Sequence, residues 1–218
     1  MANLKKSSAI RLFLYFAGFL IMTFGVAVSI KSGLGVSPIS SVPYTMTVVF
    51  GIELGLATTL FSILCALLEI PILRKKYKPV NLLQIPVSMV FGFFRSSCVK
   101  LVQYVPDPSN FAVRLVLIFV STFIIAVGVF MYLSAGYIPL PTEGLLLAIA
   151  EATNTKFASL KVAGDVTMVA VSLATCLIAI HSFGSIGLGT VISALLVGTE
   201  VKFITKHFGE TVKKAIAS

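Results

Sequence analysis

The sequence predicts an all-α membrane protein of six transmembrane helices, arranged as two inverted three-helix repeats, each with a re-entrant or interfacial segment broken by glycine and proline. Three observations predict this fold. Of the 218 residues, 57% are hydrophobic and only 11% are charged, and a mean hydropathy of +1.03 excludes a water-soluble domain. The apolar residues form long uncharged runs between short polar links. Features of the first half of the chain recur in the second half.

Six apolar runs are expected to cross the bilayer, because about 20 helical residues at ~1.5 Å rise each cover ~30 Å of hydrocarbon. The third run contains Pro86, which is expected to kink or open its helix. Two further apolar segments, 38–50 and 143–153, are too short to cross and should enter the bilayer partway or lie at its surface. The six runs occupy residues 12–30, 54–73, 79–94, 115–133, 162–180 and 186–201.

The basic residues gather in short clusters beside the apolar runs. The formal net charge is +9, and clusters of this kind are typical of cytoplasmic loops rather than of a nucleic-acid-binding face. Six spans then place both termini in the cytoplasm, although Arg95, Lys100 and Arg114 fall on the outer side. The clusters are Lys5, Lys6 and Arg11; Arg74, Lys75, Lys76 and Lys78; and Lys202, Lys206, Lys213 and Lys214.

Internal repetition divides the chain into two three-span repeats, residues 1–105 and 106–218, joined by a proline-containing link. An odd number of spans in each repeat inserts the second upside down relative to the first, with a pseudo-two-fold axis in the membrane plane. At an offset of 103 residues the identical pairs are Arg11/Arg114, Leu12/Leu115, Leu14/Leu117, Phe16/Phe119, Ile21/Ile124, Gly25/Gly128, Val26/Val129, Gly33/Gly136 and Pro38/Pro141. At an offset of 106 the third spans align through Leu82/Leu188, Gly92/Gly198 and Lys100/Lys206.

Two polar breaks follow the first and fourth spans, at residues 32–41 and 136–144. Paired breaks in matching halves predict a transporter-type binding site at the bilayer midplane. Ser37-Pro38 and Pro141-Thr142 each read as a helix start, and two helix N-termini facing one cavity attract an anionic or strongly polar group. The alternative is a pair of ordinary surface turns. The candidate solute-binding residues are Gly33, Gly35, Ser37, Pro38, Ser40, Ser41, Tyr44, Gly136, Pro141, Thr142 and Glu143.

Two acids are candidates for proton coupling, because a charged side chain inside a membrane is costly and needs a reason. Glu143 lies on the second break, where the alternative is simple helix capping at the surface. Asp165 lies four residues after Lys161, and the alternative is that the two neutralise each other on one helix face. Glu53 and Glu69 flank the second span and are expected to form surface ion pairs, Glu69 with Arg74.

Enzyme chemistry has little support in the sequence. It contains no Walker A loop, no zinc-protease or nucleophile-elbow motif, and no cluster with metal-ligand spacing. Cys65, Cys98 and Cys176 are scattered and read as packing residues, and His181 and His207 are isolated. We therefore expect no enzyme activity, cofactor or metal site.

The stretch Ser32-Gly33-Leu34-Gly35-Val36-Ser37-Pro38 resembles the YczE/YyaS/YitT family of bacterial integral membrane proteins. Many relatives carry Trp-Asp after the proline, whereas this chain has Ile39-Ser40, so no role of that acid carries over to Ser40. The resemblance implies a location in the bacterial cytoplasmic (inner) membrane and a transport role.

Together these features predict a transporter that moves a small polar or anionic solute by alternating access, with proton coupling through Glu143. Its partners would be the solute and the lipid bilayer, with a homodimer as a further expectation. One alternative is a substrate-binding membrane subunit of a multi-component importer, such as the vitamin-binding components of energy-coupling-factor importers. Another is a membrane scaffold or regulator, in which Gly and Ser serve only helix packing.

Overall fold

The computed structural model describes residues 2–217, and within them the chain forms eight α-helices and two short 3₁₀-helices, with no strand. This confirms the predicted all-α class. The elements are α1 (Ala2–Ser32), α2 (Pro38–Phe50), α3 (Leu54–Leu73), η1 (Arg74–Lys76), η2 (Pro79–Leu83), α4 (Gln84–Gln103), α5 (Phe111–Ser134), α6 (Pro141–Thr153), α7 (Phe157–Ile180) and α8 (Leu188–Ala217).

Six of the described helical segments are long and apolar enough to cross a membrane, as predicted. The third differs from expectation in its form, because η2 comes first and α4 then continues unbroken from Gln84 to Gln103, with Pro86 in its first turn. A proline there leaves no interior hydrogen bond missing. The two remaining helices, α2 and α6, have 13 residues each and are too short to span.

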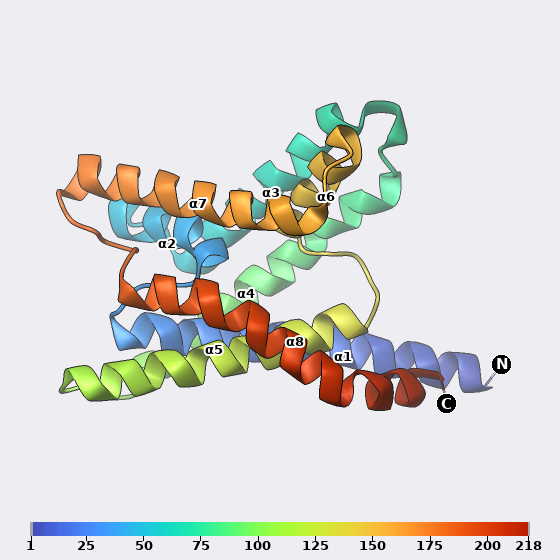
Figure 1. The fold of residues 1–218 in the computed structure, drawn as a ribbon, viewed down its shortest axis with the longest axis horizontal. Coiled ribbons are helices and arrows are strands. Elements are labelled where there is room, and N and C mark those ends of the chain that lie inside the picture. Colours follow the sequence, from blue (N-terminus) through green and yellow to red (C-terminus); the bar gives the residue numbers. More distant parts are fainter. Residues whose placement is uncertain (1, 218) are drawn as a thin grey trace.

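The helices form two layers joined by α4 (Figure 1). One layer contains α1, α5 and α8, and the other contains α2, α3, α6 and α7, while α4 packs on both α1 and α3. An aromatic cluster of Tyr15, Phe19, Phe91 and Tyr132 fills the core where α1, α4 and α5 meet. The layers therefore meet around the middle of α4.

Glycines bring α1 and α5 into close antiparallel contact. A Cβ at Gly18 would lie 2.7 Å from the backbone nitrogen of Tyr132, and one at Gly25 would lie 2.9 Å from that of Ile125. The two helices therefore run in opposite directions. Such close backbone approach is typical of helix pairs inside membranes, where small residues take the place of hydrophobic packing.

The two breaks share one backbone geometry. Gly33 and Gly136 both have φ of 67°, in the left-handed region that glycine tolerates. Each short helix then begins from an extended N-cap residue, Ser37 or Leu140, with proline at its first position. The helix start predicted at Ser37-Pro38 is confirmed. In the second break, the cap is Leu140 rather than a polar residue.

The start of α1, the end of α8 and the basic segment Arg74–Lys76 lie at the same end of the molecule (Figure 1). The side chains of Lys5 and Lys6 lie outside the described part of the chain. This arrangement agrees with a multi-pass membrane protein in which both helix ends and the basic segment Arg74–Lys76 share one side. The cytoplasmic placement of that side stays a prediction.

Candidate functional site

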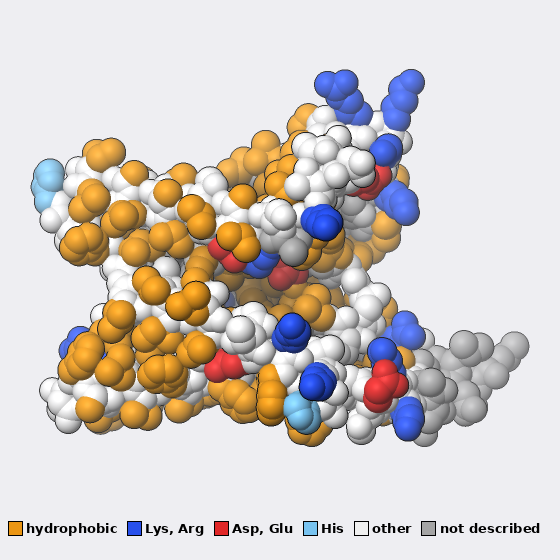
Figure 2. All heavy atoms as spheres, viewed as in Figure 1, with side chains coloured by type: hydrophobic (Ala, Val, Ile, Leu, Met, Phe, Trp, Pro, Cys, Tyr) orange, Lys and Arg blue, Asp and Glu red, His pale blue; other side chains and the backbone are white. Residues whose placement is uncertain are grey.

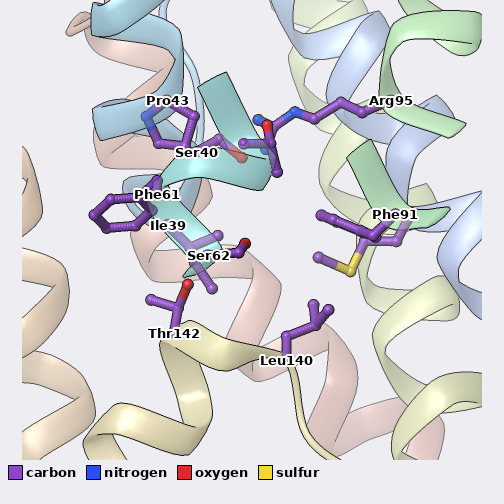
Figure 3. A pocket seen from close by; sticks show the side chains of 11 residues that line it. Ile39, Ser40, Pro43, Phe61, Ser62, Phe91, Arg95, Leu140 and Thr142 are labelled. Carbon is purple, nitrogen blue, oxygen red and sulfur yellow. The ribbon is translucent and has the colours of Figure 1, made fainter. Parts of the chain in front are cut away.

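A central cavity lies where the starts of α2 and α6 meet α1, α3 and α4 (Figure 3). Its volume is about 20 Å³, enough for about one water molecule. The two predicted breaks therefore approach one buried place instead of lying apart in bulk water. The lining residues are Met22, Ile39, Ser40, Pro43, Thr58, Phe61, Ser62, Phe91, Arg95, Leu140 and Thr142.

Arg95 is the charged group of this cavity. Its side chain extends from α4 towards the Ser40 side of the cavity (Figure 3) and is only 3% exposed. Within the described part of the chain, its Nε and Nη2 atoms have no hydrogen-bond partner. Buried guanidinium groups are normally paired, because an unpaired buried charge costs several kcal/mol. The cavity therefore offers hydrogen-bond donors and a positive charge that no acid of the described residues pairs with.

Hydroxyl groups and helix ends surround the guanidinium. Ser40 and Ser62 are buried, and Thr142 is half-buried on the opposite break. Neither N-cap side chain bonds to the first turn of its helix, at Ser37 or at Leu140. The N–H groups of Ser40 and Glu143 bond to the carbonyls of the N-cap residues, so the starts of α2 and α6 offer the cavity chiefly the positive end of the helix dipole. All these groups favour an anion.

Only some of the predicted solute-binding residues reach this cavity. Ser40 and Thr142 line it, while Ser37, Pro38 and Pro141 are buried at the adjoining helix starts. Ser37 donates a hydrogen bond to Ser40, with 3.1 Å between the two hydroxyl oxygens.

The other predicted residues lie elsewhere. The Ser41 hydroxyl donates back to the Pro38 carbonyl at 2.6 Å, and Tyr44 is half-buried further along α2. Gly35 packs against the backbone of Gly187, and a Cβ at Gly136 would meet nothing within 4 Å. The glycines therefore shape the approach to the helices and do not line the cavity, because their turns precede the helix starts by several residues.

Gly33 contributes to a second, wider cavity of about 340 Å³ beside the link between the two halves. Two cations, Lys31 and Arg114, line it together with one acid, Asp107, so its lining is basic on balance. The Lys31 ammonium lies 2.7 Å from a carboxylate oxygen of Asp107. The hydrogen bond and charge of Lys31 lower the pKa of Asp107 below its ordinary value. This basic cavity would attract anions towards the molecule.

Glu143 lies beside the central cavity rather than in its lining. It is half-buried, and the Tyr132 hydroxyl donates a hydrogen bond to it. The nearby charges are those of Lys161 and Asp165, which bond to each other at 2.7 Å. The neutralising pair considered for Asp165 is therefore present, while a proton-coupling role for Glu143 or Asp165 stays a prediction.

The interpretation of Glu69 as a surface ion pair with Arg74 is wrong. Glu69 is 1% exposed and accepts hydrogen bonds from the Asn81 and Gln84 side chains, both at 3.3 Å. The chain folds back after α3 through η1 and η2, and this return brings Asn81 and Gln84 over the carboxylate. Glu53 does form an exposed ion pair, at 4.0 Å from Lys100. The three cysteines are buried and free, as expected of packing residues.

Sequence reasoning missed Arg95 because it ended the third span at residue 94 and placed Arg95 outside. In the structure α4 continues for nine more residues, to Gln103. The signal was an arginine with further apolar residues beyond it, since an ionisable residue inside a span marks a functional site. Thr58 and Ser62, one turn apart on α3, were missed as well.

Comparison with known proteins places the chain among membrane proteins. A family model described as a family of unknown function (DUF6198) matches residues 9–206. The chain belongs to this family. It is also 26% identical over 216 residues to the uncharacterized membrane protein YczE of Bacillus subtilis (strain 168), covering 98% of this chain and 94% of the relative. The resemblance drawn from the glycine-rich break is thereby confirmed. No solved structure matches the chain.

Proposed function

We propose that this DUF6198 protein is a membrane transporter that moves a small inorganic anion or a carboxylate by alternating access. The single observation that carries the proposal is Arg95, a buried guanidinium with two nitrogens unpaired within the described chain. It faces a cavity at the starts of two short helices. A bound anion would supply the missing partner, and the size of the cavity favours a single small group.

The buried, unpaired charge of Arg95 distinguishes a ligand-binding site from a purely structural one. A scaffold gains nothing from an unpaired internal charge, since an apolar side chain of similar volume would be neutral or stabilising there. A site that must bind and release an anion needs that charge to lack a fixed protein partner. The basic cavity at Lys31 and Arg114 offers a region from which anions can be drawn in.

Alternating access is supported by the likeness of the two halves together with one difference between them. Both breaks have the same turn and the same helix start. In the first half Gly92 of α4 packs against Gly55 of α3, where its Cβ would lie 2.6 Å from a backbone oxygen. A Cβ added at Gly198, the aligned position on α8, would meet no atom within 4 Å. Figure 2 shows the surface hollowed between the layers of α7 and α8. Exchange of these two packings between the halves would expose the site on alternate sides.

Proton coupling through Glu143 extends the proposal. Glu143 follows Thr142, which lines the cavity, and it sits in the first turn of α6. A change in its protonation changes the charge beside the anion and the hydrogen bond from Tyr132. The free energy of anion binding would then depend on whether Glu143 is protonated.

Replacing Arg95 tests the proposal. Purified protein is mixed with chloride, phosphate, sulfate, formate or acetate, and anion binding is read as a shift in the unfolding temperature. Arg95→Met should weaken binding about 10- to 100-fold, because hydrogen bonds to a charged group are worth about 1.5–3 kcal/mol. Without anion, the variant should be no less stable than the wild type, since it no longer buries an unpaired charge.

Lys100→Gln is the matched control, because Lys100 is an exposed cation on the same helix. It should leave anion binding unchanged. Anion flux into liposomes then separates a transporter from a binding subunit, which would bind without flux. A wild-type protein that responds to no anion, or an Arg95→Met variant that responds equally, would refute the proposal.

A further inference from the structure

We propose that Glu69 and Gln84 form a binding site for a monovalent cation, best suited to Na⁺. Glu69 lies near the end of α3, Gln84 begins α4, and both face Gly144 on α6. The site is separate from the Arg95 cavity and uses different side chains. Its role as the coupling site of transport rests on the proposed function, whereas cation binding itself does not.

Burial and unfilled hydrogen bonding identify the site. Glu69 and Gln84 are each 1% exposed. One carboxylate oxygen, Oε2, accepts bonds from Asn81 and Gln84. Within the described chain the other, Oε1, has no partner, and neither does Oε1 of Gln84. The buried hydroxyl of Tyr77, in the turn between α3 and α4, also has no partner there. The two Oε1 atoms are hydrogen-bond acceptors, and a positive group could satisfy both of them.

Gly144 shows that the unpartnered oxygens converge. The position of an added Cβ at Gly144 lies 2.3 Å from Oε1 of Glu69, and 2.7 Å and 2.9 Å from Nε2 and Oε1 of Gln84. Nε2 already donates to the other carboxylate oxygen of Glu69. Both unpartnered oxygens therefore lie close to each other and to the backbone of α6. The two distances place the oxygens no more than about 5.2 Å apart, and hard cations contact oxygen at about 2.3–2.6 Å, so one ion between them can touch both. Any side chain larger than that of glycine would occupy this space.

The chemistry of the ligands selects the class of ion. A carboxylate and an amide carbonyl are hard oxygen donors, which favour alkali and alkaline-earth ions over transition metals. One carboxylate balances one positive charge. Lys76 of the nearby basic segment contacts Glu151 at 3.4 Å, and within the described part of the chain Glu69 forms no ion pair. A buried carboxylate without a cation is costly, and the confined space beside Gly144 favours Na⁺ over larger ions.

The site also adjoins the proposed anion site through α6. Thr142 lines the central cavity, and Gly144, two residues later, contacts Glu69 and Gln84. A cation bound there would hold the first turn of α6 against α3 and α4. Cation binding would in this way stabilise the arrangement in which the Arg95 cavity is formed.

Sodium titration of the purified full chain in detergent tests the proposal. NaCl replaces choline chloride at constant ionic strength, so that the anion does not change, and the unfolding temperature is recorded. We expect a saturable rise of a few degrees with Na⁺ and a smaller one with K⁺. Glu69→Gln removes the charge, Gly144→Ala fills the site without altering charge, and both should abolish the Na⁺ response.

Glu200→Gln is the matched control, because Glu200 is also a carboxylate of a candidate span with one oxygen bonded to Thr122 and the other unpartnered within the described chain. It should keep the response, as should Arg95→Met, which separates this proposal from the anion site. No Na⁺ response in the wild type would overturn the proposal. A Na⁺ response that persists in Gly144→Ala would also overturn it, even if Glu69→Gln failed to fold. An unfolding temperature that changes with pH but not with Na⁺ would overturn the Na⁺ site and assign the position to a proton.

Discussion

Buried charged and polar side chains carry most of the functional information in this molecule. Arg95 and Glu69 both lie in the interior, yet their surroundings differ. Within the described part of the chain, Arg95 has unpaired donors beside hydroxyl groups and helix starts, whereas Glu69 has an unpaired acceptor beside an amide oxygen. The first environment suits an anion and the second a cation. The same physical rule, that buried charges need partners, therefore supports both proposed sites, which are of opposite sign.

Glu143→Gln should remove the pH dependence of anion flux. The amide keeps the size of the side chain but does not titrate, so the charge beside the cavity no longer changes with pH. Tyr132→Phe, which removes the hydrogen bond to Glu143, should shift the dependence without abolishing it. Flux into liposomes would be measured over a range of pH values.

Glu151→Gln serves as the control, since Glu151 is an exposed acid on the same helix that pairs with Lys76. Its pH profile should match the wild type. An unaltered profile in Glu143→Gln would remove Glu143 from the coupling role and leave Asp165 to be tested in the same way.

Close helix packing depends on particular glycines at the scale of elements. Gly92 lets α4 approach α3, and an added Cβ would lie 2.3 Å from the Thr59 hydroxyl and 2.6 Å from the Gly55 carbonyl oxygen. The second of these is backbone and cannot move aside by rotation. The corresponding glycine of α8, Gly198, faces open space. Two glycines at aligned positions therefore have different structural roles.

Gly92→Ala should lower the free energy of unfolding by about 1–3 kcal/mol, as overpacking does. Gly198→Ala should change it by no more than about 0.5 kcal/mol, as expected of an exposed position. Denaturant unfolding in detergent would compare the two variants with the wild type. Equal losses would show that α8 is packed as tightly as α4.

The two predicted repeats have similar breaks but dissimilar helix packing at the scale of the whole molecule. In the first half α3 and α4 are joined by Gly55 and Gly92, while in the second α7 and α8 enclose a hollow (Figure 2). If the halves exchange these packings during transport, Gly198 must come close to α7 in the other conformation. A large side chain there would obstruct that conformation alone.

Gly198→Leu is therefore expected to reduce anion flux at least tenfold while the unfolding temperature and anion binding stay at wild-type values. Flux in liposomes and thermal unfolding would be measured on the same preparation. Val191→Leu offers a control at another exposed position of α8. Wild-type flux in Gly198→Leu would contradict closure of α7 on α8.

Much of the architecture was predictable from local patterns. Long apolar runs define spans because no other structure satisfies the backbone in lipid, and proline after an extended residue starts a helix, as at Pro38 and Pro141. The short lengths of α2 and α6 were also visible in the sequence. The end of the third span was misplaced because Arg95 was read as a boundary, although a buried cavity can hold a charged residue within a helix.

The sequence by itself determined the all-α membrane class, the six candidate spans and the two broken segments, since these depend on local composition and backbone preference. Only the tertiary structure decided that Ser40 and Thr142 share a cavity with Arg95, and that Glu69 turns inward against Gly144. Which side chains meet depends on how distant helices pack and on how the chain returns through η1 and η2. Hydropathy and residue spacing along the chain do not contain that information.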